Sequence, residues 1–115
     1  METINFTVKG QNYVTEPMTV GRVVDLWKMR SSLSMGTYGQ MYRFALYGSD
    51  AALNIIDVEA FFTVFCPDFI QKLKPSTISS MGISDYLEVE EVYMDQIKPW
   101  LVKTETMLKN SKDEV

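Results

Sequence analysis

The sequence contains no histidine and only one cysteine, Cys66, among its 115 residues. Histidine is the commonest general base near neutral pH and the commonest metal ligand in proteins. A lone cysteine cannot form an intramolecular disulfide, and without histidine it has no neighbouring base to activate it as a nucleophile. We therefore interpret Cys66, which lies between Phe65 and Pro67, as a buried and unreactive thiol.

Motifs that bind phosphates, dinucleotides or zinc are also missing from the sequence. Residues 36–39 read Gly-Thr-Tyr-Gly, but they follow no predicted strand, so we interpret them as a turn. Carboxylate pairs such as Asp57 with Glu59 lie too close along a helix to face each other. We therefore expect no catalytic residues, no metal, no cofactor and no small-molecule substrate, and we do not expect an enzyme.

Long hydrophobic runs are absent as well. The most apolar stretch, residues 60–66, contains Thr63 and is far shorter than the ~20 residues that span a bilayer. Residues 1–5 carry neither the basic nor the apolar segment of a signal peptide. Because a single cysteine also suits a reducing compartment, we expect a soluble, cytoplasmic protein that does not enter membranes.

The charge balance is acidic, with 11 Lys and Arg against 15 Asp and Glu and a net charge of −4. Such a chain is repelled by the phosphates of nucleic acids and by anionic lipids. The best candidate for a local basic patch is Arg22, Lys28 and Arg30 on one predicted helix, and Asp25 weakens it. We therefore expect no binding to nucleic acid.

The composition is that of a globular protein, with 46% hydrophobic and 23% charged residues, and the length fits one domain. We predict an α+β fold, mostly α, in which an N-terminal β-hairpin (residues 1–16) packs on a bundle of about four to five helices (residues 19–110). The domain covers residues 1–110, and residues 111–115 form a frayed polar tail.

The N-terminal residues predict the hairpin by their alternation. Ile4, Phe6 and Val8 alternate with polar residues, as in a half-buried strand. Gly10 at the first position of a two-residue loop suits a type II′ turn, which sets Val8 opposite Tyr13 on the returning strand.

The first helix is predicted from Val20 to Leu33, with Thr19 as its N-cap. Gly21 in the first turn costs about 1 kcal/mol relative to alanine, which suggests that another segment packs closely against it. One face of this helix is predicted to be apolar and contains Val20, Val23, Val24 and Trp27.

The middle of the chain predicts two further helices after a break at residues 34–36. A helical stripe follows the break and comprises Tyr38, Met41, Tyr42, Ala45 and Leu46. Residues 51–66 are apolar nearly all round, which indicates a helix that is central to its domain or covered by another chain.

The C-terminal part predicts a short helix at residues 68–73, a polar loop at 76–82 and a long last helix. Asp85 and Glu88 have the spacing of a capping box. Pro99 is expected to kink or restart the helix. The residues expected to face inward are Leu87, Val89, Val92, Tyr93 and Ile97. The carboxylates expected to form a solvated face are Glu88, Glu90, Glu91 and Asp95.

Several features favour a protein that binds other proteins. An isolated two-stranded hairpin is marginal in water. The apolar helix has more surface than short neighbours cover, and the chain holds eight methionines and 14 aromatic residues, which suit contact surfaces. The alternative is that all of these residues belong to the core. The predicted interaction residues are Phe6, Val8, Tyr13, Trp27, Tyr38, Tyr42 and Trp100.

Residues 17–26 (Pro-Met-Thr-Val-Gly-Arg-Val-Val-Asp-Leu) and 33–39 follow the predicted hairpin. This order of elements and the start of the helix resemble the tail assembly chaperones of bacteriophages. The resemblance implies partners among phage tail or virion components, such as the tape-measure and tail-tube proteins, which a chaperone keeps soluble in the host cytoplasm before assembly.

Two other functions remain open. A structural virion protein, such as a connector or ring subunit, would stay in the particle. It would join its neighbours, either other proteins or further copies of itself, through the hairpin edge and helix faces. A small enzyme or regulator of a host pathway is the third alternative, against which the missing histidine and phosphate-binding loop argue.

Overall fold

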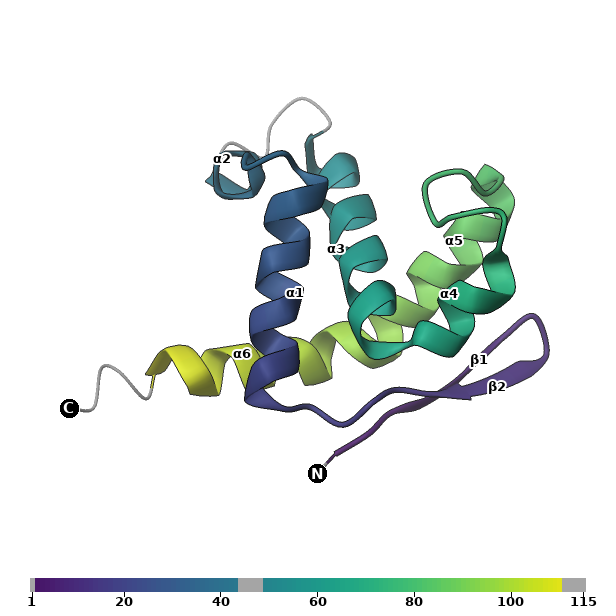
Figure 1. Ribbon diagram of the computed structural model, residues 1–115, viewed down its shortest axis with the longest axis horizontal. Coiled ribbons are helices and arrows are strands. Elements are labelled where there is room, and N and C mark those ends of the chain that lie inside the picture. Colours follow the sequence, from purple (N-terminus) through teal and green to yellow (C-terminus); the bar gives the residue numbers. More distant parts are fainter. Residues whose placement is uncertain (1, 44–48, 111–115) are drawn as a thin grey trace.

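The computed structural model describes residues 2–43 and 49–110, and it is mostly helical with an N-terminal hairpin (Figure 1). The predicted fold class is therefore confirmed. Ala45, Leu46 and the predicted tail at 111–115 lie outside the described residues. The elements are β1 (Asn5–Val8), β2 (Gln11–Val14), α1 (Val20–Leu33), α2 (Tyr38–Arg43), α3 (Ser49–Phe65), α4 (Pro67–Leu73), α5 (Ile83–Val92), the π-helical turn η1 (Tyr93–Ile97) and α6 (Lys98–Asn110).

The two strands pair antiparallel, but the predicted register is wrong. Phe6 lies opposite Tyr13, and Val8 lies opposite Gln11. The loop residues are Lys9 and Gly10, with φ of 51° and 77°. Positive φ at both central positions is the pattern of a type I′ turn, whose twist matches that of paired strands, so the loop begins one residue earlier than a type II′ turn would require.

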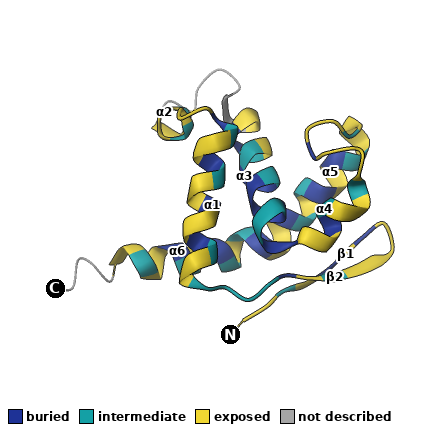
Figure 2. Ribbon diagram, viewed as in Figure 1, coloured by how far each residue is buried: buried dark blue, intermediate teal, exposed yellow. Residues whose placement is uncertain are grey.

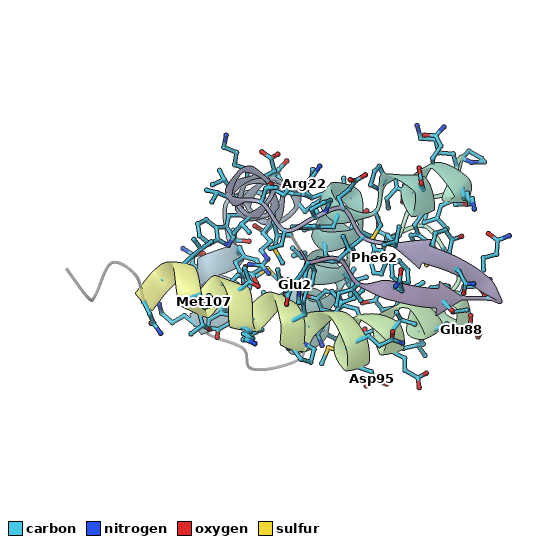
Figure 3. The ribbon with its side chains drawn as sticks, turned by 90° about the horizontal axis from the view of Figure 1, so that it is seen from below. Glu2, Arg22, Phe62, Glu88, Asp95 and Met107 are labelled. Atoms are coloured by element: carbon cyan, nitrogen blue, oxygen red, sulfur yellow. The ribbon has the colours of Figure 1, made fainter. Side chains whose placement is uncertain are left out.

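The hairpin packs on the helical body through its inner face. Phe6 and Val8 are only 3% and 6% exposed, and the Phe6 ring meets the rings of Tyr13 and Phe62 with centroids 5.5 Å away in each case. The strand ends are tied by Thr15, whose Oγ1 accepts from the backbone N–H of Ile4 at 2.9 Å. Seen from below, Phe62 lies beside the hairpin within the helical body (Figure 3). The predicted packing of the hairpin on the helices is therefore confirmed.

Helix α1 has the predicted bounds and the predicted cap, but a different buried face. Thr19 Oγ1 accepts from the backbone N–H of Arg22 at 3.1 Å. The buried residues of α1 are Val23, Leu26 and Arg30, whereas Val20 is 68% exposed. The buried face of α1 is therefore the one that packs against α3, and it differs from the predicted apolar face. Packing between the two helices decides which side of α1 is buried.

The rest of the predicted apolar face is less buried, and one further prediction about α1 is wrong. Val24 and Trp27 are more than a third exposed, so Val23 alone of that face lies in the core. A Cβ added to Gly21 would meet no atom within 4 Å, so no segment packs closely against that glycine.

Helix α3 is the centre of the domain, which is the first of the two alternatives that its apolar sequence leaves open. It contacts α1, α2, α4 and α5, and its C-terminal half is almost wholly buried (Figure 2). Phe61 and Phe65 stack with ring centroids 4.9 Å apart, and Trp100 of α6 lies edge-on to both rings. The buried α3 residues around this stack are Val58, Ala60, Phe61, Phe62 and Phe65.

The C-terminal arm is one long helical run from α5 through η1 to α6. At η1 the N–H of Lys98 bonds to the carbonyl of Tyr93, five residues earlier. Pro99 follows in the first turn of α6, and a proline lacks the N–H that an α-helical interior uses. π-Helical turns occur where the regular i to i−4 hydrogen bonds of an α-helix are interrupted. The kink or restart predicted at Pro99 therefore takes the form of a π-helical turn.

The start of this arm differs from the prediction. Helix α5 begins at Ile83 with Gly82 as its N-cap and no side-chain cap, so the predicted capping box does not form. Asp85 instead pairs with Lys9 at 2.6 Å. Leu87 is exposed and Tyr86 takes its place in the core. Glu88 and Asp95 point outward, as expected for a solvated face (Figure 3).

Candidate functional site

A groove of about 800 Å³ lies between α1, α2, α3 and α6. Its floor holds Arg30 of α1, Asp57 of α3 and Glu105 of α6. The walls add the tyrosine rings of α2 and η1 and aliphatic side chains. The wall residues are Tyr38, Tyr42, Leu53, Tyr93, Leu101 and Val102. This size falls within the range of ligand-binding clefts, and the mixture of apolar walls with a few polar groups is typical of them.

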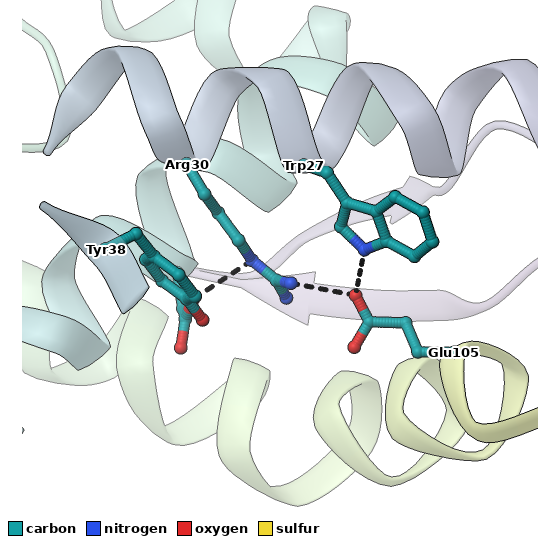
Figure 4. Close-up of polar contacts among 5 residues, drawn as sticks. Trp27, Arg30, Tyr38 and Glu105 are labelled. Atoms are coloured by element: carbon teal, nitrogen blue, oxygen red, sulfur yellow. Dashed lines mark hydrogen bonds and ion pairs between the residues drawn. The ribbon is translucent and has the colours of Figure 1, made fainter. Parts of the chain in front are cut away.

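The floor of the groove is an ion-pair network centred on Arg30 (Figure 4). Arg30 Nη1 donates to Glu105 Oε1 at 2.8 Å, and Arg30 Nε lies 3.1 Å from Asp57 Oδ1. The Nε contact lacks hydrogen-bond geometry, so it is an ion pair only. Tyr38 donates its hydroxyl to Asp57 Oδ1 at 2.6 Å, and Trp27 Nε1 donates to Glu105 Oε1 at 2.9 Å.

The network joins three helices and the short α2, and its three charged side chains are about nine-tenths buried. The Arg30 side chain is 10% exposed, and its two carboxylate partners are 11% and 12% exposed. The guanidinium carbon of Arg30 also lies 5.3 Å from the centroid of the Tyr38 ring. A buried cation that is shared by two carboxylates and covered by a ring fixes the relative positions of the helices that carry these groups.

Burial sets the ionisation of the network. Desolvation is the largest effect on Asp57 and raises the pKa of its carboxyl above the usual value, against the opposing effects of the Tyr38 hydrogen bond and the Arg30 charge. Burial likewise raises the pKa of the Tyr38 and Tyr93 hydroxyls, which therefore stay protonated near neutral pH. Asp57 Oδ1 is already occupied by Tyr38 and Arg30, so this oxygen is not free to accept a proton from a substrate.

Three more cations stand at the rim of the groove. They are Arg43 of α2 and Lys98 and Lys109 of α6. In the described part of the chain no ion pair involves any of them. With Arg30, the described residues of the groove comprise four cations and two carboxylates, which is a surplus of two positive charges in a chain whose net charge is −4.

The predicted interaction residues differ in their exposure and lie in different parts of the structure. Phe6 and Val8 belong to the core, because the hairpin turns their side chains toward α3 and α5, so the prediction that they form a surface is wrong. Tyr13 is half-buried against Phe69, and Trp100 is half-buried and donates to Glu2 at 2.9 Å.

Only Tyr38 and Tyr42 of the predicted set line the groove together. Trp27 lies beside it and is joined to its floor through the hydrogen bond to Glu105. The candidate basic patch on α1 does not exist as a surface, because Arg30 is buried and Arg22 donates to the carbonyl of Pro17.

Sequence reasoning missed the floor of the groove. The signal that could have found it is a charged residue on an apolar helix face. Arg30 follows Val23 at i+7, Asp57 stands next to Val58 in the apolar helix, and Glu105 follows Leu101 at i+4. Their opposite signs suggest pairing, but spacing within each helix says nothing about contacts between helices.

Other chemistry is sparse in the part of the chain that the structure describes. Among residues 2–43 and 49–110, no group of three acidic or cysteine side chains could hold a metal ion. Cys66 is 2% exposed, and burial raises the pKa of its thiol, which confirms the interpretation of a buried cysteine. None of the described helices combines the length and the apolar character that crossing a bilayer requires.

Comparisons with known protein families, with curated proteins and with solved structures found no match to this chain.

Proposed function

We propose that this chain is a non-enzymatic protein-binding module that holds a segment of a client protein in the groove. The observation that carries the proposal is the groove itself, because apolar and aromatic walls surround a floor whose own charges are already paired. Tyr42 at its edge is 70% exposed, an unusual position for a large ring unless it contacts another molecule.

We propose further that the client is a phage tail component and that the chain is a tail assembly chaperone of the host cytoplasm. The residues that carry this resemblance, 17–26 and 33–39, comprise the cap and first half of α1, its end and the start of α2. The second of these segments contributes Tyr38 and Gly39 to the groove. Residues 17–26 do not line the groove, so the resemblance and the proposed binding site share only these two residues.

Co-expression with a phage tape-measure or tail-tube protein tests this proposal. We expect the client to move from the insoluble to the soluble fraction and to co-elute with the chain. The groove variant combines Tyr42→Ala with Val102→Ala, which removes two wall side chains that the core does not use. The control variant combines Ile83→Ala with Leu87→Ala, which removes exposed apolar side chains of α5. Loss of client solubility only with the groove variant supports the proposal, and an equal yield of client with and without the chain contradicts it.

A structural virion protein is the second candidate, and the hairpin favours it. The described sheet contains only β1 and β2, so each strand has one edge without a strand partner. Such edges can join a neighbouring subunit by strand addition. Mass spectrometry of purified virions separates the two functions, because a structural subunit is present in stoichiometric amounts and a chaperone is absent.

A further inference from the structure

Three charged residues of the groove lie along one face of α6. Lys98, Val102, Glu105 and Lys109 follow one another at intervals of four, three and four residues, so they share that face. Glu105 is held by Arg30 and Trp27, which leaves a lysine at each end and an aliphatic side chain between them. Arg43 of α2 lines the same groove.

From this arrangement we infer that the groove binds an acidic, amphipathic peptide segment of the client, with carboxylates on Lys98, Lys109 and Arg43 and an apolar side chain on Tyr42 and Val102. The inference rests on the proposed function and names the chemistry of the client segment. Charge complementarity favours an anionic partner, because the described residues that line the groove carry a surplus of two positive charges.

The length of the charged face favours a peptide over a small anion. Lys98 and Lys109 are 11 residues apart on one helix, which corresponds to about 16 Å along its axis. An extended segment of about five residues, at roughly 3.3 Å per residue, covers that distance. A single carboxylate or phosphate contacts only one end of it.

The walls and the overall charge argue against nucleic acid. Three rim cations are few for a partner whose affinity depends on the number of neutralised phosphates, and the rest of the chain is acidic. The aliphatic surfaces of Leu53, Leu101 and Val102 in turn match the apolar side chains of a peptide.

The test uses a displayed library of random twelve-residue peptides, selected on the intact chain and counter-selected on the variant Arg43→Gln, Lys98→Gln, Lys109→Gln. We expect selected peptides with two or more carboxylates that flank a large apolar side chain. The selected peptide and its copy with every glutamate and aspartate changed to the amide are then compared by fluorescence anisotropy. The matched control is Lys28→Gln, Lys74→Gln, Lys103→Gln, which removes the same charge from exposed positions outside the α2–α6 groove.

We expect the groove variant and the amide peptide each to weaken the Kd by about tenfold or more, as the loss of three partly exposed charge contacts implies. The control variant should stay within about twofold of the unaltered chain. Overturning results are a library without acidic enrichment, equal binding to the groove and control variants, or binding of the uncharged peptide as tight as that of the acidic one. Tighter binding of a fluorescent oligonucleotide than of the acidic peptide in the same anisotropy assay would also overturn the inference.

The two proposals fail in different ways. If the acidic peptide does not bind but the chain still keeps a tail protein soluble, the groove assignment is wrong and the chaperone function stands. If the peptide binds at the groove but no tail protein is kept soluble, the assignment of the groove stands and the client must be another acidic protein.

Discussion

Replacement of Arg30 by methionine should destabilise the fold strongly, because Arg30 is the cation at the centre of the buried network. Methionine keeps most of the side-chain length but removes the cation that two buried carboxylates share. The three side chains are 10–12% exposed, so little solvent is present to compensate the charges that remain. Removal of one partner from a buried ion pair costs about 3–5 kcal/mol.

For a domain of this size, that loss corresponds to a fall in Tm of roughly 10–20 °C. Urea unfolding at pH 7, followed by far-UV circular dichroism, measures it as a lower midpoint with an unchanged slope. The matched control is Asp57→Asn, which keeps an acceptor for Tyr38 and leaves Arg30 paired with Glu105. We expect that control to lose no more than about 1 kcal/mol.

A triple variant isolates the cause of the loss. Arg30→Met combined with Asp57→Leu and Glu105→Leu removes the carboxylates together with the cation, and such replacements of buried ion pairs are often neutral or stabilising. We expect its stability to exceed that of Arg30→Met alone. The reasoning is refuted if the free energy of unfolding of Arg30→Met lies within about 1 kcal/mol of that of the unaltered chain. It is also refuted if the triple variant is no more stable than Arg30→Met alone.

The pH dependence has a defined sign. Burial raises the pKa of Asp57 above its usual 3.8, so the folded state holds this proton more tightly than the unfolded state does. At a pH above the pKa that Asp57 has in the folded state, its ionised carboxylate lowers the free energy of unfolding. This loss of stability is relieved as the pH falls from that pKa toward 3.8. In Arg30→Met the Asp57 carboxylate loses its cation, so protonation relieves more of the cost of burying it. The difference in the free energy of unfolding between this variant and the unaltered chain should therefore narrow as the pH is lowered from 7.

Three further outcomes are expected. Phe62→Ala should lower the free energy of unfolding in urea titrations by about 3–5 kcal/mol, because the ring is 0% exposed at the junction of α3 and the hairpin. The control Ile83→Ala, at an exposed position, should change it by less than about 0.5 kcal/mol. Thr19→Ala should cost about 0.5–2 kcal/mol by the same measurement, and Thr19→Ser should restore most of it, because the hydroxyl caps α1. Cys66 should react with a disulfide reagent at pH 8 only after unfolding in urea, and rapid labelling of the native chain would contradict its burial.

Local signals predict the boundaries of several elements. Helix α1 begins after Thr19 and ends at Leu33 as its cap and the following Met35-Gly36 break predict, because both depend on backbone groups within a few residues. Helix α4 begins at Pro67, one residue before the predicted start at Asp68, because proline is favoured at the first position of a helix. The mostly helical fold with a hairpin at the N-terminus also follows from periodicity alone.

The hairpin register shows where a local signal misleads. Gly10 does mark the turn, but the choice between turn types depends on whether Lys9 also takes a positive φ. The twist of the paired strands and the packing of Phe6 on Phe62 settle that choice. A loop that starts one residue away moves every cross-strand partner, although the inward and outward alternation of β1 is kept.

The sequence by itself therefore determined that no histidine is present, where most helices lie and that α3 is apolar on nearly all sides. Only the tertiary structure decided which side of α1 is buried and that Arg30, Asp57 and Glu105 meet in one groove. The physical reason is that a helix boundary depends on neighbours in the chain, whereas a buried ion pair depends on the approach of three helices that are as much as 75 residues apart.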